Sequence, residues 1–254
     1  MTKVISVVNH KGGVGKTTTS ASLIAGLTNK GKRVIGIDMD GQANLTSLLG
    51  IGEQEENIYT ALKAGNGLPI YLNDFGAKVV PSTLDLQAAE VELSNEPGRE
   101  LLLKGLLAPY LSQLDYVIID CPPSLGLLTL NALTASTHVI IPIEAEPLSL
   151  KGMSTILSII DKVKSRLNKD LQIMGVLVTK FDGRKIINRE VLQAATTHYP
   201  GLVFDTKIRD NVRLAETAAL AKDIFSYDSD SNGAKDYQAL CEELIQKEDS
   251  SVEA

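Results

Sequence analysis

The chain has 254 residues, of which 44% are hydrophobic and 4% aromatic, and its formal net charge is −6. This length allows one large domain or two small ones around a sizeable core. The few aromatic residues argue against a stacking platform for single-stranded nucleic acid, and the acidic balance means that nucleic acid would need a local basic face. Two distant cysteines, Cys121 and Cys241, exclude a disulfide framework or a zinc cluster.

A membrane attachment is not expected. The sequence has no apolar run that approaches the length of a bilayer span, and its first residues begin a strand rather than a signal peptide. We therefore expect a cytoplasmic protein that makes no membrane contact.

The first element in chain order is a strand, a glycine-rich turn and a helix over residues 4–30. The apolar, β-branched run at 4–8 predicts a buried strand. The turn that follows contains three residues without Cβ, which let backbone N–H groups approach an anion: Gly12, Gly13 and Gly15. The helix start adds free N–H groups and a dipole, so Lys16 is predicted to contact the β- and γ-phosphates of ATP, and Thr17 to ligate Mg²⁺.

A second lysine in this loop needs a separate explanation. The ordinary pattern G-x-x-x-x-G-K-[ST] would place its first glycine at His10, whereas here Lys11 precedes the glycines. Lys11 is poorly placed for the phosphates that Lys16 contacts, but well placed for those of a facing subunit. The alternative is that Lys11 is a solvated surface charge.

Acidic residues follow two further apolar runs, at 33–38 and 115–120. In a parallel α/β sheet, ligands bind at the carboxyl ends of the strands, where these acids lie. Asp38 and Asp40 follow the first run, and we expect one to face the nucleotide while the other anchors the loop; alternatively, both cap the next helix. Asp120 ends the second run in the manner of a Walker B acid and is predicted to hold Mg²⁺ through a water.

The remaining pattern predicts the fold. Apolar runs at 78–82, 137–143 and 171–179 indicate further strands, and residues 148–167 have the spacing of a long helix. Together the units predict a doubly wound, mostly parallel α/β sheet of about seven strands, with helices on both faces. We expect a single domain over 1–247, followed by an acidic, disordered tail over 248–254.

Residues 180–222 form a net basic segment in an otherwise acidic protein, with eight positive and five negative side chains. Its positive residues are Lys180, Arg184, Lys185, Arg189, Lys207, Arg209, Arg213 and Lys222. Such a run is often only a solvated face, but it also supplies the local basic surface that binding to double-stranded DNA would require.

Four stretches carry a resemblance to a known family: K-G-G-V-G-K-T at 11–17, D-M-D-G-Q at 38–42, G-V-L-V-T-K-F-D-G-R at 175–184 and I-R-D-N-V-R-L-A-E at 208–216. The chain resembles the deviant Walker ATPases of the ParA/MinD family, and most nearly the Soj-type partitioning proteins. It departs from the family pattern at Gly41 and Arg209, where proline is usual.

The resemblance implies roles for particular residues. Lys11 would cross the interface of an ATP-sandwiched homodimer. The metal site would be formed by Thr17, Asp40 and Asp120, and Asp40 would also orient the attacking water. Arg209 and Asn211 would lie at the adenine, whereas Arg184 and Arg213 would bind DNA without sequence preference. The phosphate loop would bind the nucleotide through Lys11, Gly12, Gly13, Val14, Gly15, Lys16, Thr17 and Thr18.

The implied activity is that of a slow, nucleoid-associated ATPase that partitions DNA and is stimulated by a ParB-like centromere-binding protein. A positioning ATPase for a protein cluster or another cargo would have the same core. An iron-protein-like reductase would need differently spaced cysteines. A metabolic enzyme of the dethiobiotin-synthetase type would need a substrate pocket and would not use the crossing lysine, and a bacterial tyrosine kinase would have a tyrosine-rich tail.

Overall fold

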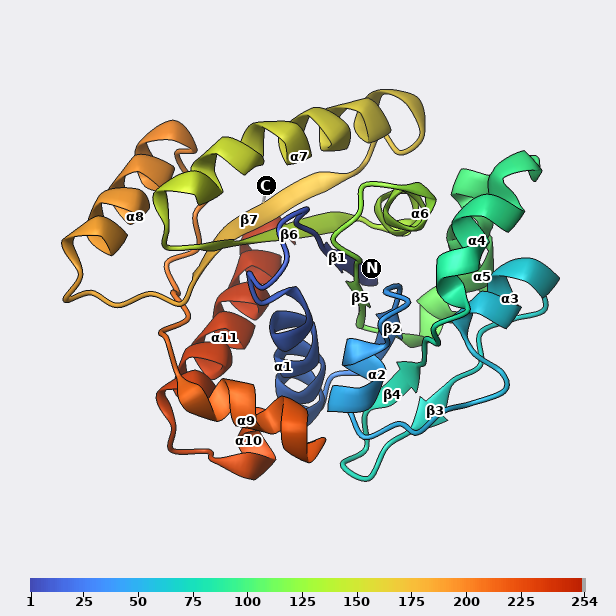
Figure 1. The fold of residues 1–254 in the computed structure, drawn as a ribbon, viewed down its shortest axis with the longest axis horizontal. Coiled ribbons are helices and arrows are strands. Elements are labelled where there is room, and N and C mark those ends of the chain that lie inside the picture. The colour runs from blue at the N-terminus through green and yellow to red at the C-terminus, as the bar shows by residue number, and fades with distance from the viewer. Residues whose placement is uncertain (253–254) are drawn as a thin grey trace.

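The computed structural model describes residues 1–252 and consists of one seven-stranded sheet covered by helices on both faces (Figure 1). The strand order is β3-β4-β2-β5-β1-β6-β7. The strands are β1 (Lys3–Val7), β2 (Val34–Asp38), β3 (Tyr71–Leu72), β4 (Lys78–Val80), β5 (Tyr116–Asp120), β6 (His138–Glu144) and β7 (Gln172–Thr179).

All neighbouring strands are parallel except β3 and β4, which form an antiparallel pair at the edge of the sheet. The predicted doubly wound, mostly parallel fold is therefore confirmed. The sequence did not predict β3, because two residues are too few to show the alternation that indicates a strand.

Eleven α-helices are assigned over the described residues, together with short 3₁₀ turns. They are α1 (Lys16–Asn29), α2 (Asn44–Leu48), α3 (Ile58–Ala64), α4 (Leu86–Glu92), α5 (Leu102–Leu107), α6 (Leu127–Ala135), α7 (Pro147–Arg166), α8 (Ile186–His198), α9 (Val212–Leu220), α10 (Ile224–Tyr227) and α11 (Asn232–Val252). Helix α11 extends to Val252 and so includes the first five residues of the predicted disordered tail, whereas residues 253–254 lie outside the described residues.

The sheet separates two hydrophobic cores because side chains alternate along each strand. In β5, Val117 and Ile119 belong to one core, whereas Tyr116 and Ile118 belong to the other. The first core is covered by α3 to α8, and the second by α1, α2 and α11 (Figure 1). No helix in the described part of the chain is long and apolar enough to cross a membrane.

Parallel pairing brings the functional strand ends together at one edge of the sheet. Val7 of β1 and Asp38 of β2 both stand beside Asp120 of β5. Since all three strands run in the same direction, the phosphate loop and the two acids meet at the carboxyl edge, where α/β folds bind ligands.

Candidate nucleotide site

The phosphate loop connects β1 to α1 and is shaped by two left-handed glycines. Gly13 has φ 77° and Gly15, the N-cap of α1, has φ 88°, a region that side chains other than glycine rarely adopt. A Cβ built on Gly12 or Gly13 would meet no described atom within 4 Å. The loop therefore leaves open space in front of the amino end of α1, where backbone N–H groups favour a phosphate.

Lys16 is the first residue of α1, and its side chain is buried at the phosphate loop. Its exposed fraction is 7%, and its Nζ donates a hydrogen bond to the carbonyl of Lys11 at 3.1 Å. Burial lowers the pKa of Lys16, partly opposed by the charges of Asp120 and Asp40. A phosphate would be a stronger acceptor than the carbonyl, since hydrogen bonds between two charged groups are the stronger ones.

Asp120 joins the loop to the centre of the sheet. Its two carboxylate oxygens accept hydrogen bonds from Thr17 Oγ1 at 2.7 Å and from Ser20 Oγ at 2.9 Å. The side chain is fully buried, and burial together with the charge of Asp38 raises its pKa to about 7. The sequence predicted Thr17 and Asp120 as partners at the metal but did not identify Ser20.

Asp38 and Asp40 play different parts. Asp38 is fully buried and accepts hydrogen bonds from the backbone N–H and hydroxyl of Thr46 and from the N–H of Asp40. Burial raises its pKa to about 6. Asp40 is half-buried and accepts a hydrogen bond from the Gln42 N–H at 3.0 Å. Asp38 thus anchors the loop, and Asp40 is the acid that can turn toward a nucleotide.

The donor set fits Mg²⁺ bound together with a nucleotide. Two fully buried carboxylates, Asp38 and Asp120, lie close enough for the charge of Asp38 to raise the pKa of Asp120. A bound cation would reduce this repulsion between like charges. Among the described residues, no group of three or more His, Cys, Asp or Glu side chains could hold an ion unaided. This agrees with the preference of Mg²⁺ for one or two protein oxygens plus phosphates and waters.

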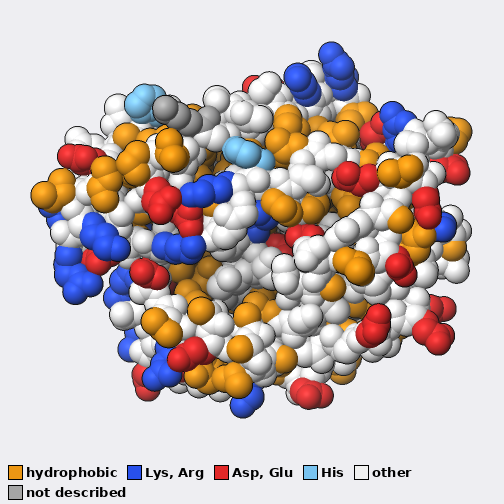
Figure 2. All heavy atoms as spheres, in the orientation of Figure 1, with side chains coloured by type: hydrophobic (Ala, Val, Ile, Leu, Met, Phe, Trp, Pro, Cys, Tyr) orange, Lys and Arg blue, Asp and Glu red, His pale blue; other side chains and the backbone are white. Residues whose placement is uncertain are grey.

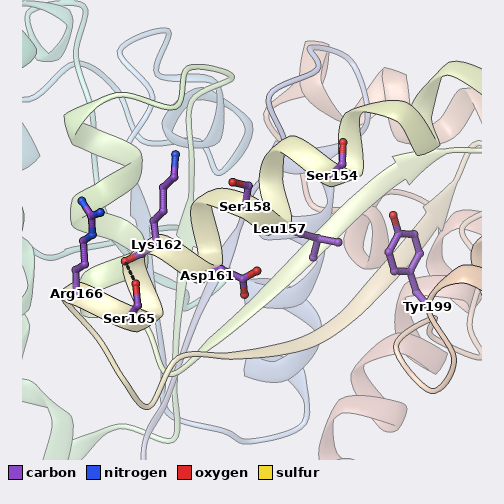
Figure 3. A pocket seen from close by; sticks show the side chains of 8 residues that line it. All are labelled: Ser154, Leu157, Ser158, Asp161, Lys162, Ser165, Arg166 and Tyr199. Atoms are coloured by element: carbon purple, nitrogen blue, oxygen red, sulfur yellow. Dashed lines mark hydrogen bonds between the residues drawn. The ribbon is translucent and has the colours of Figure 1, made fainter.

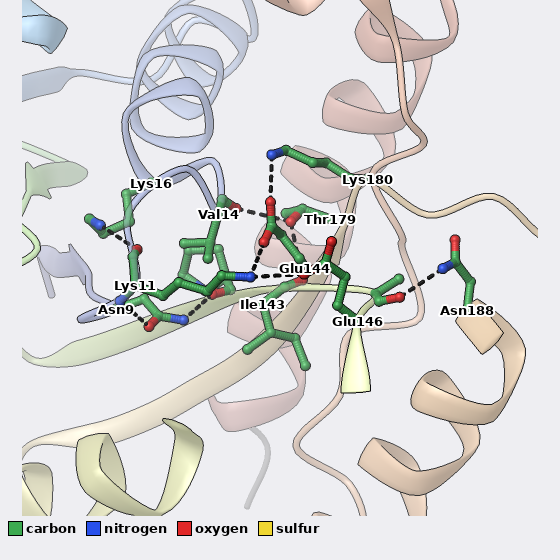
Figure 4. A network of polar contacts seen from close by, with 12 residues as sticks. Asn9, Lys11, Val14, Lys16, Ile143, Glu144, Glu146, Thr179, Lys180 and Asn188 are labelled. Carbon is green, nitrogen blue, oxygen red and sulfur yellow. Dashed lines mark hydrogen bonds and ion pairs between the residues drawn. The ribbon is translucent and has the colours of Figure 1, made fainter. Parts of the chain in front are cut away.

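The Lys11 side chain extends out of the phosphate loop toward the end of β6, and its charge is already paired (Figure 4). Its Nζ donates to the carboxylates of Glu144 and Glu146, and these hydrogen bonds raise its pKa. Glu144 also accepts a hydrogen bond from Lys180. Sequence reasoning missed Glu144, although it ends β6 at the same edge of the sheet as Asp38 and Asp120.

The region predicted to contact the adenine is held by contacts within the chain. The Arg209 guanidinium pairs with Asp236 of α11, with a shortest distance of 2.6 Å. Asn211 is the N-cap of α9, and its side chain accepts a hydrogen bond from the Arg213 N–H. Contact with the base remains a prediction for both residues, and in this conformation their side chains have other partners.

Of the two arginines predicted to bind DNA, Arg184 lies in the loop before α8 and Arg213 lies in the first turn of α9. Basic side chains gather on the left of the face shown in Figure 2, where α8 lies in Figure 1. The Arg184 side chain is 91% exposed and pairs with Asp182, whereas Arg213 pairs with Glu216 and Asp228. Both guanidinium groups are accessible, but a phosphate would have to compete with these carboxylates.

Gly41, which stands where the family has proline, is buried against α4. A Cβ at this position would lie 2.6 Å from Gln87 Cγ and 3.1 Å from the Gln87 backbone nitrogen. Packing against Gln87 therefore accounts for a residue without Cβ at this position.

A shallow groove elsewhere on the surface does not belong to the nucleotide site. It follows α7 and has a volume of about 640 Å³ (Figure 3). Its lining residues are Ser154, Leu157, Ser158, Asp161, Lys162, Ser165, Arg166 and Tyr199, none of which is in the phosphate loop.

The parallel sheet, the phosphate loop and the buried Walker B acid define the chain as a P-loop nucleoside triphosphatase. A family model for the AAA domain matches residues 2–173. The chain is 42% identical to the chromosome partitioning protein ParA of Myxococcus xanthus over 251 residues, which cover 97% of this chain and 89% of the relative. It is also 42% identical to the sporulation initiation inhibitor protein Soj of Bacillus subtilis over 249 residues, with 96% and 98% covered.

Among solved structures, cobyrinic acid a,c-diamide synthase from Mycobacterium smegmatis with bound ADP and magnesium superposes with a TM-score of 0.87 at 36% identity, covering 99% of this chain and 97% of the other. The chain belongs to the ParA/Soj family of P-loop ATPases. Structures of the M. smegmatis protein contain ADP with magnesium and an ATP analogue with magnesium.

Proposed function

We propose that the protein is an ATP-dependent DNA-partitioning ATPase that works in the cytoplasm on nucleoid DNA. The observation that supports this most directly is that the side chains of two lysines in one loop point in different directions. Lys16 is buried where phosphates would lie, whereas Lys11 reaches outward to Glu144 and Glu146. A cation that faces away from its own loop suits the nucleotide of a second subunit, so ATP would close a homodimer.

The residues of the site would then act in sequence. Lys16 would exchange the Lys11 carbonyl for the β- and γ-phosphates, and the Thr17 hydroxyl and Asp120 would hold Mg²⁺, which neutralises charge on the phosphates. Asp40 would orient the attacking water. Hydrolysis by this set alone would be slow, because a cation supplied in trans typically accelerates such reactions by roughly 10³–10⁵. A basic segment of a ParB-like centromere-binding protein would supply that cation.

Dimer formation would also control DNA binding. Each subunit offers Arg184 and Arg213, so pairing doubles the number of phosphate contacts. Because log K falls with log salt by about 0.9 per neutralised phosphate, doubling the contacts strengthens binding steeply. Hydrolysis would separate the subunits and release the DNA, and repeated release would move the cargo.

Non-specific binding to double-stranded DNA, measured with ATP, with ADP and without nucleotide over a range of salt, tests this proposal. We expect tight binding only with ATP. The Arg184→Ala, Arg213→Ala double variant should reduce the salt slope by about 3 to 4 for the dimer, since four phosphate contacts are lost. Lys104→Ala, an exposed lysine on α5 far from this surface, is the matched control. DNA binding that is the same with all nucleotide states would contradict the proposal.

Two alternatives remain distinguishable. A positioning ATPase for a protein cluster would share the ATPase and DNA results, but a ParB-like segment would not stimulate its hydrolysis. An amide synthase, as the M. smegmatis protein is named, needs an acceptor pocket beside the phosphates. The cavity next to the first acidic loop, lined by Gly41, Gln42 and Ser82 among others, has a volume of about 240 Å³. That volume is below the roughly 300–1,000 Å³ of sites for drug-sized ligands, so this cavity gives no support to an amide synthase.

A further inference from the structure

Lys11, the proposed crossing lysine, belongs to an ion cluster at the carboxyl edge of the sheet (Figure 4). Its Nζ donates to Glu144 and, at 3.0 Å, to Glu146. The Glu144 side chain is 10% exposed and also accepts from Lys180, so two lysines share one nearly buried carboxylate. Glu146 is 61% exposed and contributes less, because exposed ion pairs are weak.

The backbone of Lys11 is held by hydrogen bonds within the loop, whereas its side chain is held only by its ion pairs. The Lys11 N–H donates to Asn9 Oδ1 at 3.0 Å, and Asn9 Nδ2 in turn donates to the Pro142 carbonyl at 2.6 Å. The Lys11 side chain is 37% exposed. Crossing to a second subunit therefore requires only rotation of the side chain, but that rotation breaks both of its ion pairs.

Lys180 reduces the free energy lost when the Lys11 side chain rotates away from Glu144. A buried carboxylate that loses its only cation is strongly destabilised. When Lys11 leaves, Glu144 would still be paired with Lys180, which follows the end of β7 in a left-handed conformation with φ 50°. Non-glycine residues adopt this conformation rarely, and it tends to occur where surrounding structure imposes it. The neighbouring Thr179 hydroxyl bonds to the Val14 carbonyl, so the strand end that carries Lys180 is tied to the phosphate loop.

We infer that Glu144 is a positioning residue: it holds Lys11 in the uncrossed position and so sets how readily two ATP-loaded subunits pair, and Lys180 keeps Glu144 neutralised while Lys11 crosses. This inference rests on the proposed function, since it needs an ATP-dependent dimer. It assigns opposite effects to the two partners of one ion pair, which a merely structural role would not produce.

The dimer dissociation constant, measured by sedimentation with Mg²⁺ and a hydrolysis-resistant ATP analogue, tests the inference. Glu144→Gln should tighten pairing by about ten-fold, because Lys11 is released. Lys180→Met should weaken it by about ten-fold, because Glu144 would lose its remaining cation when Lys11 leaves. In the Glu144→Gln background, Lys180→Met should have little further effect, since the two changes act through the same carboxylate.

Two controls complete the design. Glu146→Gln should change the dissociation constant by less than about two-fold, as expected for an exposed pair. Asp115→Asn removes an ion pair with Arg33 at the opposite edge of the sheet and should change nothing. Analogue binding by each monomer and its thermal unfolding temperature report whether a variant is folded.

The outcomes separate the two proposals. If the wild-type chain stays monomeric with the analogue, the proposed function fails and this inference fails with it. If the wild-type chain pairs, but Glu144→Gln and Lys180→Met leave pairing unchanged or both weaken it, the inference alone is overturned and the proposed function stands.

Discussion

At the residue scale, Lys16 and Asp40 have different proposed roles, in nucleotide binding and in hydrolysis. Lys16 lies in the phosphate loop, and its present acceptor is only a backbone carbonyl. Asp40 is half-buried, and its carboxylate caps the N–H of Gln42 two residues later. We therefore expect Lys16 to act in nucleotide binding and Asp40 in the chemical step that follows.

We expect Asp40→Ala to keep ATP binding but to lower the rate of hydrolysis by about 10²–10⁴, the usual contribution of a positioned acid or base. The variant should accumulate as a DNA-bound dimer with ATP.

Lys16→Ala should instead weaken ATP binding at least about 100-fold, or roughly 2.7 kcal/mol. Single-turnover hydrolysis and ATP titration measure the two effects. Asp74→Ala, an exposed acid in the turn between β3 and β4, is the control. Normal hydrolysis by Asp40→Ala would show that another group positions the water.

The sequence was sufficient for the part of the site that lies close together in the chain. Residues 11–18 follow one strand, and their spacing alone predicts a phosphate loop. The partners of Lys11 and Arg209 were not predictable in this way, because Glu144 and Asp236 lie 133 and 27 residues away along the chain. Only the assembled sheet and the packing of α11 bring these charges together.

At the scale of elements, α4 packs against two loops, one after β2 and one before α6. Gln87 packs on Gly41, next to Asp40, and Glu90 packs on Gly126 at the amino end of α6. These two helix residues are three apart and therefore lie on the same face of α4. Strands and long helices were predictable from periodicity, but this contact was not, because a seven-residue helix carries little pattern and its partners are distant in sequence.

Gly41→Pro, which restores the family residue, should destabilise the fold by about 1–3 kcal/mol, the usual cost of overpacking. The reason is that the new side chain would meet Gln87, whose nearest atoms include its backbone nitrogen. Chemical denaturation measures the change. Gln87→Ala removes Cγ and should recover part of the loss when combined with Gly41→Pro, whereas Gln42→Ala should not. A fully stable Gly41→Pro variant would mean that α4 moves away at little cost.

At the scale of the whole molecule, the buried acid pair Asp38 and Asp120 links stability to pH and to metal. Burial raises the pKa of Asp38 to about 6, and burial with the charge of Asp38 raises that of Asp120 to about 7. The folded chain thus keeps protons that the unfolded chain releases above about pH 4. Unfolding then releases protons, so this pair stabilises the fold fully below about pH 4 and loses that effect as pH rises toward 7.

Other titratable groups also change the free energy of unfolding with pH. The difference in this free energy between a variant and the wild-type chain therefore isolates the acid pair. Burial lowers the pKa of His138 to about 4, which makes stability rise with pH below about 6.5. Hydrogen bonds from Arg33 and Arg184 lower the pKa values of Asp115 and Asp182 to about 2, so their contribution is lost only as pH falls below about 4. None of these groups differs between the wild-type chain and an Asp38 variant.

We therefore expect the free energy of unfolding of Asp38→Asn, relative to wild type, to increase between pH 4 and pH 7 by up to about 3 kcal/mol, because asparagine cannot ionise. Denaturation in urea without nucleotide or Mg²⁺, at pH 4, 5.5 and 7, measures this difference. Adding ATP and Mg²⁺ should reduce it, since a cation at Asp120 favours the ionised carboxylates. Parallel stability curves would mean that Asp38 is ionised throughout this range in the folded chain, and that the charge at the centre of the site is already compensated without metal.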